Sequence, residues 1–276
     1  MYAPDSVHYD VFRKGSKTYF NASRFFPKDV RTDVFSLYGF VRRADNFVDS
    51  VPQDTKGFYD FVKRYRHALA AVAAVPTSDP IIERFVELAR RKQFKPEWTD
   101  AFLRSMEMDL TKRHHVTLEE SLEYIYGSAE VVGLFMTRLL NLDSRADGAA
   151  RMLGRAMQYI NFIRDIAEDN RFGRTYLPVS ESSLESLDES HVRERPGEFV
   201  EFIHAQLQRY QVWQNQAEQG YQFLPRKYRG PVKTAGDMYK WTGRQIAADP
   251  FIVYDRKVKP NRARIVISGL LNALHY

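Results

Sequence analysis

Hydrophobic and polar residues recur along most of the 276-residue chain at three- and four-residue steps, which is typical of amphipathic α-helices. Proline falls at the borders of these stretches, where it does not interrupt a helix. We therefore expect an all-α protein. The pattern predicts helices over residues 28–50, 55–74, 79–92, 97–112, 118–141, 147–172, 197–222, 229–248 and 259–274, with an exposed connection over residues 179–196. No linker divides the chain, so we expect residues 1–276 to form a single domain.

One predicted helix carries charged residues along a stripe that should be apolar if it faced a core. Tyr38, Arg42, Asp45 and Asp49 recur at three- and four-residue steps, so their side chains share one side of the helix. Every position of this stripe is polar. The segment therefore predicts either a functional site or a helix face that is exposed to water.

A second acidic segment lies in the predicted helix 147–172. Asn161, Asp165 and Asp169 repeat at four-residue steps, with Arg164 beside Asp165 and Gln158 about one turn earlier. Two carboxylates four residues apart on a helix repel each other unless a positive charge lies between them. Burial of such a ladder would be costly without a cation or hydrogen-bonding partners.

A hard divalent cation would relieve this repulsion. Mg²⁺ takes one or two protein carboxylates and leaves its other positions to water and substrate phosphates. The alternative is a solvated face with Arg–Asp pairs worth less than about 1 kcal/mol each. The same spacing occurs at Asp29 and Asp33 and at Asp143 and Asp147, where a first helical turn and a polar turn explain it.

Composition excludes several kinds of protein. The chain has no cysteine, which excludes disulfides, iron–sulfur clusters and cysteine-ligated zinc. It has no glycine-rich phosphate loop and no G-x-G-x-x-G, which argues against a nucleotide-binding α/β fold. No apolar run reaches the roughly 18–20 residues of a membrane-spanning helix, and the N-terminus lacks the apolar core of a signal peptide. We therefore expect a cytoplasmic protein.

The net charge of +6 is concentrated in the C-terminal part. From Arg226 onward there are eleven Lys or Arg and three Asp, so this part carries +8 and the preceding part −2. Such a patch suits an anionic substrate or an anionic membrane, whereas motifs that read nucleic acid are absent. The amphipathic residues 262–271 suit either helix packing or peripheral contact with a membrane surface. The sequence gives no indication of oligomeric state.

Four segments, in order, resemble the squalene/phytoene synthase family of head-to-head prenyl transferases. Residues 16–20 (SKTYF) and 37–49 (LYGFVRRADNFVD) resemble its N-terminal entry and its first aspartate motif, Y-x-F-x-R-x-x-D-[DN]-x-x-D. Residues 126–133 (YGSAEVVG) resemble its small-residue helix. The most specific match is residues 158–178 (QYINFIRDIAEDNRFGRTYLP), which are close to the pattern Q-x-x-N-x-x-R-D-x-x-E-D-x-x-x-G-R-x-Y-L-P.

The resemblance implies a helical bundle of the class I isoprenoid synthase type around a central cavity, with prenyl diphosphates as substrates. It implies that Mg²⁺, or Mn²⁺ in its place, is held by Asp45, Asp49, Asn161, Asp165 and Asp169. The implied catalytic residues are Asp45, Asp49, Asp165, Asp169, Tyr38 and Arg42. The implied substrate-binding residues are Ser16, Lys17, Phe20, Tyr38, Arg42, Tyr126, Gly127, Ala129, Gln158, Asn161, Arg164, Arg174 and Tyr254.

Some of these roles have a second interpretation. Gly127, Ala129 and Gly133 suit either the wall of a prenyl-chain tunnel or close packing between helices. Asp109 matches an acidic position of the family, but a solvated or helix-capping carboxylate is the simpler expectation.

The resemblance also leaves the substrate open. Residues 249–258 (DPFIVYDRKV) look like the C-terminal region of phytoene-type members, which favours two geranylgeranyl diphosphates. The alternative is a squalene- or dehydrosqualene-forming enzyme that uses two farnesyl diphosphates, with NADPH needed only by a reductive squalene synthase. Many relatives have Asp where this chain has Asn46 and Asn170, which leaves the number of metal ions open. A non-catalytic assembly subunit is a further hypothesis, opposed by the four intact aspartates.

Overall fold

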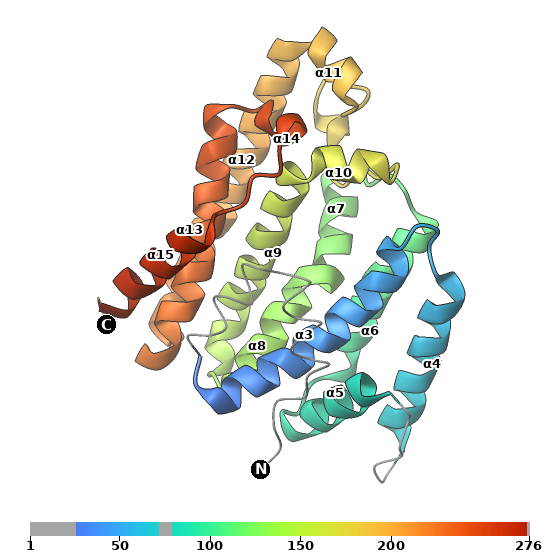
Figure 1. Ribbon diagram of the computed structural model, residues 1–276, viewed down its shortest axis with the longest axis vertical. Coiled ribbons are helices and arrows are strands. Elements are labelled where there is room, and N and C mark those ends of the chain that lie inside the picture. Colours follow the sequence, from blue (N-terminus) through green and yellow to red (C-terminus); the bar gives the residue numbers. More distant parts are fainter. Residues whose placement is uncertain (1–25, 72–78, 275–276) are drawn as a thin grey trace.

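The computed structural model describes residues 26–71 and 79–274. This part of the chain is almost entirely helical, and its β-structure is limited to one isolated bridge between His114 and Thr175. The prediction of an all-α protein is confirmed. Figure 1 shows the helices packed side by side as a bundle, with the C-terminal helix at one edge.

Most helices begin and end close to where the sequence pattern predicts. The principal helices are α3 (Lys28–Asp49), α4 (Thr55–Ala70), α5 (Pro80–Arg91), α6 (Pro96–Thr111), α7 (Leu118–Ile125), α8 (Val131–Leu139), α9 (Asp147–Arg164), α10 (Ile166–Arg171), α11 (Glu189–Glu194), α12 (Pro196–Glu218), α13 (Arg226–Ala248), α14 (Ile252–Asp255) and α15 (Arg262–Leu274). Proline occupies the first position of α5, α6 and α12, where its missing N–H costs nothing.

Three expectations need correction. The predicted helix 118–141 is interrupted by a π-helical segment, Tyr126–Glu130, between α7 and α8. The predicted helix 147–172 breaks at Asp165 into α9 and α10, because the backbone of Asp165 leaves helical geometry at ψ 12°. Residues 179–196 are not a fully exposed connection, since they contain α11 and bury Leu184, Leu187 and Val192 in the core.

Helix α9 is the centre of the bundle. It contacts α12 and α13 on one side and α7, the π-helical segment and α8 on the other (Figure 1). Its Tyr159, Ile160 and Ile163 are completely buried. The carboxyl end of α9, where the second acidic segment begins, is therefore held by neighbours on several sides.

Helix α3 is oriented by an apolar stripe that lies opposite its charged stripe. Phe40, Ala44 and Val48 are at most 1% exposed, and the ring of Phe40 stacks on Phe85 of α5 with a centroid distance of 3.8 Å. Aromatic pairs of this kind stabilise by roughly 0.5–1.5 kcal/mol beyond the area they bury. With this face fixed, the stripe of Tyr38 to Asp49 turns away from the α3–α5 interface.

Candidate active site

The first acidic segment forms an internally paired stripe on α3. The guanidinium of Arg42 donates to the carboxylate of Asp45 one turn later. Burial and then the neighbouring charge of Asp49 raise the pKa of Asp45 to about 7, although Arg42 opposes the shift. Burial also raises the pKa of the Tyr38 hydroxyl to about 12. Asp45 is therefore a carboxylate that requires more positive charge than Arg42 supplies.

The second acidic segment surrounds the break between α9 and α10. Arg164 Nε donates to Asp165 Oδ1 at 2.9 Å, and Lys257 Nζ lies 3.3 Å from the same oxygen and also pairs with Glu168. Burial acts to raise the pKa of Asp165, but the two cations outweigh it and the net shift is downward. The Oδ1 atom of Asn161, one turn earlier, is buried without a hydrogen-bond partner among the described residues.

Asp169 is the least compensated carboxylate of this segment. Burial, followed by the charge of Asp165, holds its pKa well above the ordinary range, while Arg174 acts in the opposite direction. Asp165 and Asp169 thus differ in environment although they belong to one ladder. A cation placed beside Asp169 would relieve both the burial cost and the carboxylate repulsion.

A glycine turn brings the two acidic segments together. Helix α10 ends at Arg171, and Gly173 just beyond it has a φ of 64°, in the left-handed region that glycine adopts without strain. The N–H of Arg174 donates to the carbonyl of Asp169 and that of Gly173 to Asn170, which is a Schellman-type helix end. The chain therefore reverses just before Arg174, and the side chain points back toward α3.

Arg174 connects the segments directly. This buried side chain, 4% exposed, donates from Nη1 to Asp49 Oδ1 at 2.9 Å and from Nη2 to the Val48 carbonyl at 2.6 Å. The ends of α3 and α10 are therefore neighbours in space, although they are separated widely in sequence. Sequence analysis predicts that Arg174 binds substrate, and the structure places it between the two acidic segments.

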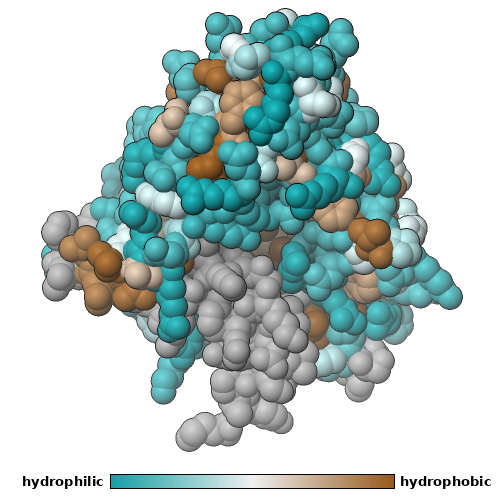
Figure 2. Space-filling view, turned by 45° about the horizontal axis from the view of Figure 1, so that its top comes forward, coloured by the Kyte–Doolittle hydropathy of each residue, from teal (hydrophilic) through white to brown (hydrophobic). Residues whose placement is uncertain are grey.

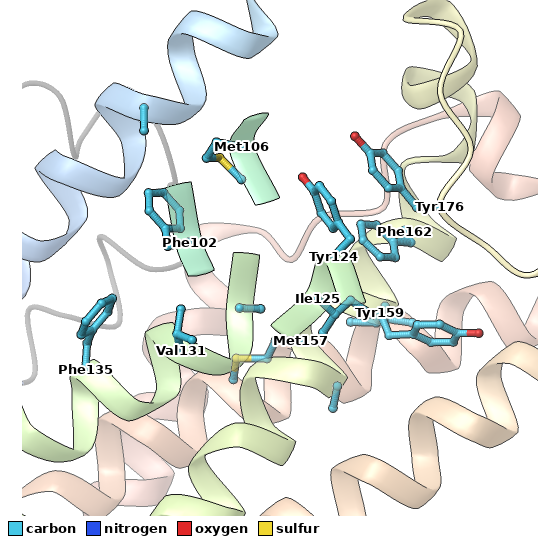
Figure 3. Packing of buried hydrophobic residues seen from close by; sticks show 14 of the residues in the cluster. Phe102, Met106, Tyr124, Ile125, Val131, Phe135, Met157, Tyr159, Phe162 and Tyr176 are labelled. Carbon is cyan, nitrogen blue, oxygen red and sulfur yellow. The ribbon is translucent and has the colours of Figure 1, made fainter. Parts of the chain in front are cut away.

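A buried network of Asp109, Tyr124 and Tyr176 lies beside Arg174. The Asp109 side chain is 2% exposed and accepts hydrogen bonds from Tyr124 Oη at 2.7 Å and Tyr176 Oη at 2.5 Å. Figure 3 shows the two hydroxyls pointing the same way, with Phe162 next to Tyr176. Burial raises the pKa of Asp109 to about 6 even though Arg174 and both hydroxyls lower it.

This network corrects one expectation and adds two residues. Asp109 is not a solvated or capping carboxylate. Tyr176 lies within the segment 158–178 that resembles the family and Tyr124 lies two residues before the segment 126–133, but their residue types and spacing do not distinguish them from core aromatics. The signal that could have found them is the buried acid, because a carboxylate in a core needs hydroxyl or cationic partners.

The donor set suits a hard divalent cation. All five predicted ligands offer oxygen, and Asn161 Oδ1, Asp45 and Asp169 each lack sufficient compensation in their surroundings. Within residues 26–71 and 79–274, however, no three His, Cys, Asp or Glu side chains form a ready metal-binding cluster. To bind several of these acids at once, a metal ion would have to displace their arginine and lysine partners.

The described residues enclose little empty space at the site. A hollow with a cavity volume of about 10 Å³ opens beside the second segment and is lined by Phe162, Ile166, Asp169, Asn170, Arg174, Thr175, Tyr176, Leu177 and Leu187. Ligand pockets for drug-sized molecules occupy roughly 300–1,000 Å³. Side chains would therefore have to move before two long prenyl chains could lie there.

The small residues of 126–133 pack helices together. A Cβ atom on Gly127 would lie 2.1 Å from the Ala101 carbonyl oxygen, and one on Gly133 would lie 2.3 Å from that of Ala150. Gly154 approaches the carbonyl of Ala129 in the same way. These contacts support close helix packing, the second of the two interpretations, and give no support to a tunnel wall at these positions.

Other predicted binding residues have different surroundings. Tyr126 is 36% exposed and its ring lies under the guanidinium of Arg151 at 5.4 Å, so it is not part of the acidic cluster. The hydroxyl of Tyr254 donates to the Leu187 carbonyl, beside the hollow. Gln158 is half-buried on α9. The predicted residues Ser16, Lys17 and Phe20 lie outside the described part of the chain.

The two asparagines differ in their environment. Asn46 is exposed on α3. Asn170 is half-buried, and its Nδ2 donates to the Leu187 carbonyl at 2.6 Å. An aspartate at position 170 would have no hydrogen to donate at neutral pH and would face the carbonyl unfavourably. The structure thus gives a reason for asparagine at this position that does not involve a metal.

Residues of the other two acid pairs have ordinary protein partners. Asp33 pairs with Arg91 of α5, with an Nη2–Oδ1 distance of 2.6 Å. Asp143 accepts from the backbone N–H of Arg145 in a polar turn.

In the described residues no helix is both long and apolar enough to span a lipid bilayer.

The architecture is that of a class of protein known from solved structures. A dehydrosqualene synthase crystallised with a ligand superposes with a TM-score of 0.80 at 20% identity, covering 97% of this chain and 94% of that one. At this identity the likeness establishes the fold alone. It confirms the helical isoprenoid synthase fold that the sequence predicts.

Sequence comparison identifies the family. The squalene/phytoene synthase family profile matches residues 12–264. A phytoene synthase of Pseudescherichia vulneris is 27% identical over 257 residues, covering 88% of this chain and 82% of the relative. A 15-cis-phytoene synthase of Paracoccus sp. is 31% identical over 176 residues, covering 61% of this chain and 58% of the relative. The chain therefore belongs to the squalene/phytoene synthase family, whose members are head-to-head prenyl transferases and generally depend on divalent metals.

Proposed function

We propose that this protein condenses two geranylgeranyl diphosphates to phytoene through a cyclopropylcarbinyl diphosphate. Loss of diphosphate from one substrate leaves an allyl cation, which the double bond of the second substrate attacks. Proton loss closes the cyclopropane, and a second loss of diphosphate starts a rearrangement whose final cation loses a proton to give phytoene. Stabilisation of the leaving group is the main catalytic task in such a sequence.

The observation that carries this proposal is the convergence of two oxygen-rich acidic segments on Arg174. Asp45 and Asp49 on one side, and Asn161, Asp165 and Asp169 on the other, are the residues that would hold Mg²⁺, or Mn²⁺ in its place. When bound, the ion would act as a Lewis acid on diphosphate oxygens.

The arginines of the site would bind the diphosphate. Arg42, Arg164 and Arg174 each contact one of the acids, and a planar guanidinium can form two parallel hydrogen bonds to phosphate. The rings of Tyr124 and Tyr176, with Phe162 stacked on Tyr176 at 4.6 Å, provide an apolar wall that would keep water from a carbocation.

The decisive experiment is product analysis with each diphosphate. The protein is incubated with Mg²⁺ and either the C20 or the C15 substrate, with and without NADPH, and hydrocarbons are identified by mass. We expect the C20 substrate to give the higher kcat/KM and phytoene as product. Preferential conversion of the C15 substrate to a C30 hydrocarbon would reject phytoene synthesis in favour of the squalene or dehydrosqualene alternative. Absence of turnover with both would favour a non-catalytic subunit.

Substitutions test the proposed roles of the charged residues. Asp45→Asn or Asp165→Asn should lower kcat by at least about 10²-fold, the scale of one lost transition-state charge contact. Near-normal turnover in either variant would reject the metal assignment. Arg42→Lys and Arg164→Lys should also be damaging, because an ammonium cannot reproduce two parallel hydrogen bonds. Full activity of the lysine variants would show that both arginines only balance the charges of Asp45 and Asp165.

The substrate length rests on the phytoene synthase relatives and on residues 249–258, which look phytoene-like. The helix-packing role of Gly127 and Gly133 removes the small residues as support for a deep tunnel. Extra methylenes change binding by only about 1–3 kcal/mol in an apolar pocket, so both substrates are expected to react to some extent. The ratio of their kcat/KM values is therefore the informative quantity.

A further inference from the structure

Helix α15 presents Ser268 and Asn272 to the protein and most of its branched aliphatic residues to water. It packs along α13, where Asn272 Nδ2 donates to Asp237 Oδ2 at 2.9 Å and to Thr234 Oγ1 at 3.2 Å. Ser268 Oγ also donates to Asp237, at 3.5 Å. Of the branched aliphatic residues in the described part of α15, only Ile265 is buried, at 2% exposure. The inner face of α15 is thus secured largely by hydrogen bonds.

The outer face of α15 is a contiguous apolar strip, formed by Val266, Ile267, Leu270 and Leu271. Their exposed fractions are 40%, 57%, 55% and 55%. Figure 2 shows hydrophobic side chains gathered at the edge of the molecule where α15 lies. Single exposed apolar residues are ordinary on protein surfaces, but four on adjacent turns of one helix mark an interaction surface.

Basic residues flank both ends of this strip. Arg262 and Arg264 are exposed in the first turn of α15, and the guanidinium of Arg264 lies 4.9 Å from the ring of Trp241. Because Asn272 lies near Gly230, α15 runs antiparallel to α13, and its far end is close to the exposed Arg226 and Lys227. Helix α15 itself contains no acidic residue.

We infer that the α15 strip docks in the headgroup region of an anionic lipid bilayer. Apolar side chains on one face with basic residues at their borders are the arrangement of interfacial helices that lie in the membrane plane. A second copy of this chain is a poorer fit, because pairing two strips would bring the basic borders of both copies together. A hydrocarbon product would also need to leave toward lipid, and this part of the reasoning rests on the proposed function.

Vesicle flotation tests the inference without any substrate. The full chain is mixed with vesicles of pure phosphatidylcholine or of phosphatidylcholine with phosphatidylglycerol, and the bound fraction is measured at low and high salt. We expect binding to the anionic vesicles that weakens with salt. The double variant Ile267→Glu/Leu270→Glu should lower the partition coefficient at least about tenfold, and Arg262→Gln/Arg264→Gln should lower it severalfold on anionic vesicles.

A matched control separates the strip from general surface hydrophobicity. Val212→Glu changes a 50% exposed apolar residue on α12 and should leave vesicle binding unchanged. Because the substituted side chains are exposed, melting temperatures should also stay close to wild type. No binding by the wild type, or equal binding by the double variant, would overturn the inference. A wild-type dimer that the double variant dissociates would instead assign the strip to a second copy. Loss of the proposed activity in other assays would not affect these outcomes.

Discussion

Replacing Arg174 with methionine tests whether this side chain holds the two acidic segments together. Methionine keeps a similar length but removes the charge and every donor. The variant loses a charged hydrogen bond to the Val48 carbonyl, a contact of about 1.5–3 kcal/mol. That carbonyl also accepts from Gln53 Nε2 at 2.8 Å, so it keeps one partner and the lower part of this range applies.

The ion pair with Asp49 adds less. Asp49 is 38% exposed and can be hydrated after the substitution, so its share is below about 1 kcal/mol. Asp109 and Asp169 are more enclosed, and in the wild-type protein Arg174 lowers the pKa of both. Their charged forms therefore become more costly in the variant. The sum is a loss of about 2–4 kcal/mol in the free energy of unfolding, which corresponds to a melting temperature lower by at least about 4 °C for a chain of this size.

The assay is thermal and urea unfolding in buffer with EDTA, repeated with Mg²⁺ and a prenyl diphosphate analogue. Arg145→Met is the matched control, because this side chain is 74% exposed and pairs with Asp143 in a surface turn. The control should change stability by less than about 0.5 kcal/mol. If Arg174→Met is as stable as the control, the two segments do not depend on this side chain and the reasoning is wrong. Bound Mg²⁺ should recover part of the loss by supplying positive charge to the same acids.

Three further substitutions follow from contacts near the site. Burial, with Lys112 nearby, lowers the pKa of His115 to about 4, so the contribution of His115 to stability should fall by about 2–3 kcal/mol as pH drops from 6.5 to 4. The raised pKa values of Asp45 and Asp109 act in the opposite direction over this range, so the informative quantity is the difference from His115→Phe: in urea titrations the wild type should lose about 2–3 kcal/mol relative to this variant between pH 6.5 and 4. Asn170→Asp should lower the free energy of unfolding by about 1–3 kcal/mol, because it loses the hydrogen bond to the Leu187 carbonyl. Asn46→Asp, at an exposed position, should be nearly neutral. Equal melting temperatures of the two variants would contradict this prediction. Gly127→Ala should cost at least about 1–3 kcal/mol by overpacking, while Gly197→Ala, where a Cβ meets nothing within 4 Å, should not destabilise.

Much of the fold is predictable because helical periodicity is a local property. The buried stripe of Phe40, Ala44 and Val48 and the charged stripe that ends at Asp49 are both visible in the sequence of α3. Helix borders marked by proline are also found, as at the start of α5 and α6. The π-helical segment 126–130 is not visible in this way. It packs closely against α6 and α9, and these contacts are not a property of the local sequence.

The acidic ladders are predictable as chemistry but not as geometry. Spacing places Asp165 and Asp169 on one helix, yet it cannot show that the chain breaks at Asp165 or that Arg164 and Lys257 already pair with this acid. Nor can it show that Gly173 turns the chain so that the next side chain reaches α3. Each of these features depends on contacts between segments that are distant in sequence.

The Asp109 network shows where local reasoning stops. An acid in the fourth turn of an amphipathic helix is explained equally well by water, by a cap or by a partner across the core, and local spacing does not distinguish these. Here the partners are Tyr124 of α7 and Tyr176 of the segment after α10, and both hydroxyls point at one carboxylate. Because a core carboxylate must be compensated, its burial requires such donors. The arrangement fixes Tyr176 close to Arg174, so the packing of α6 and α7 helps to determine where the arginine between the acidic segments lies.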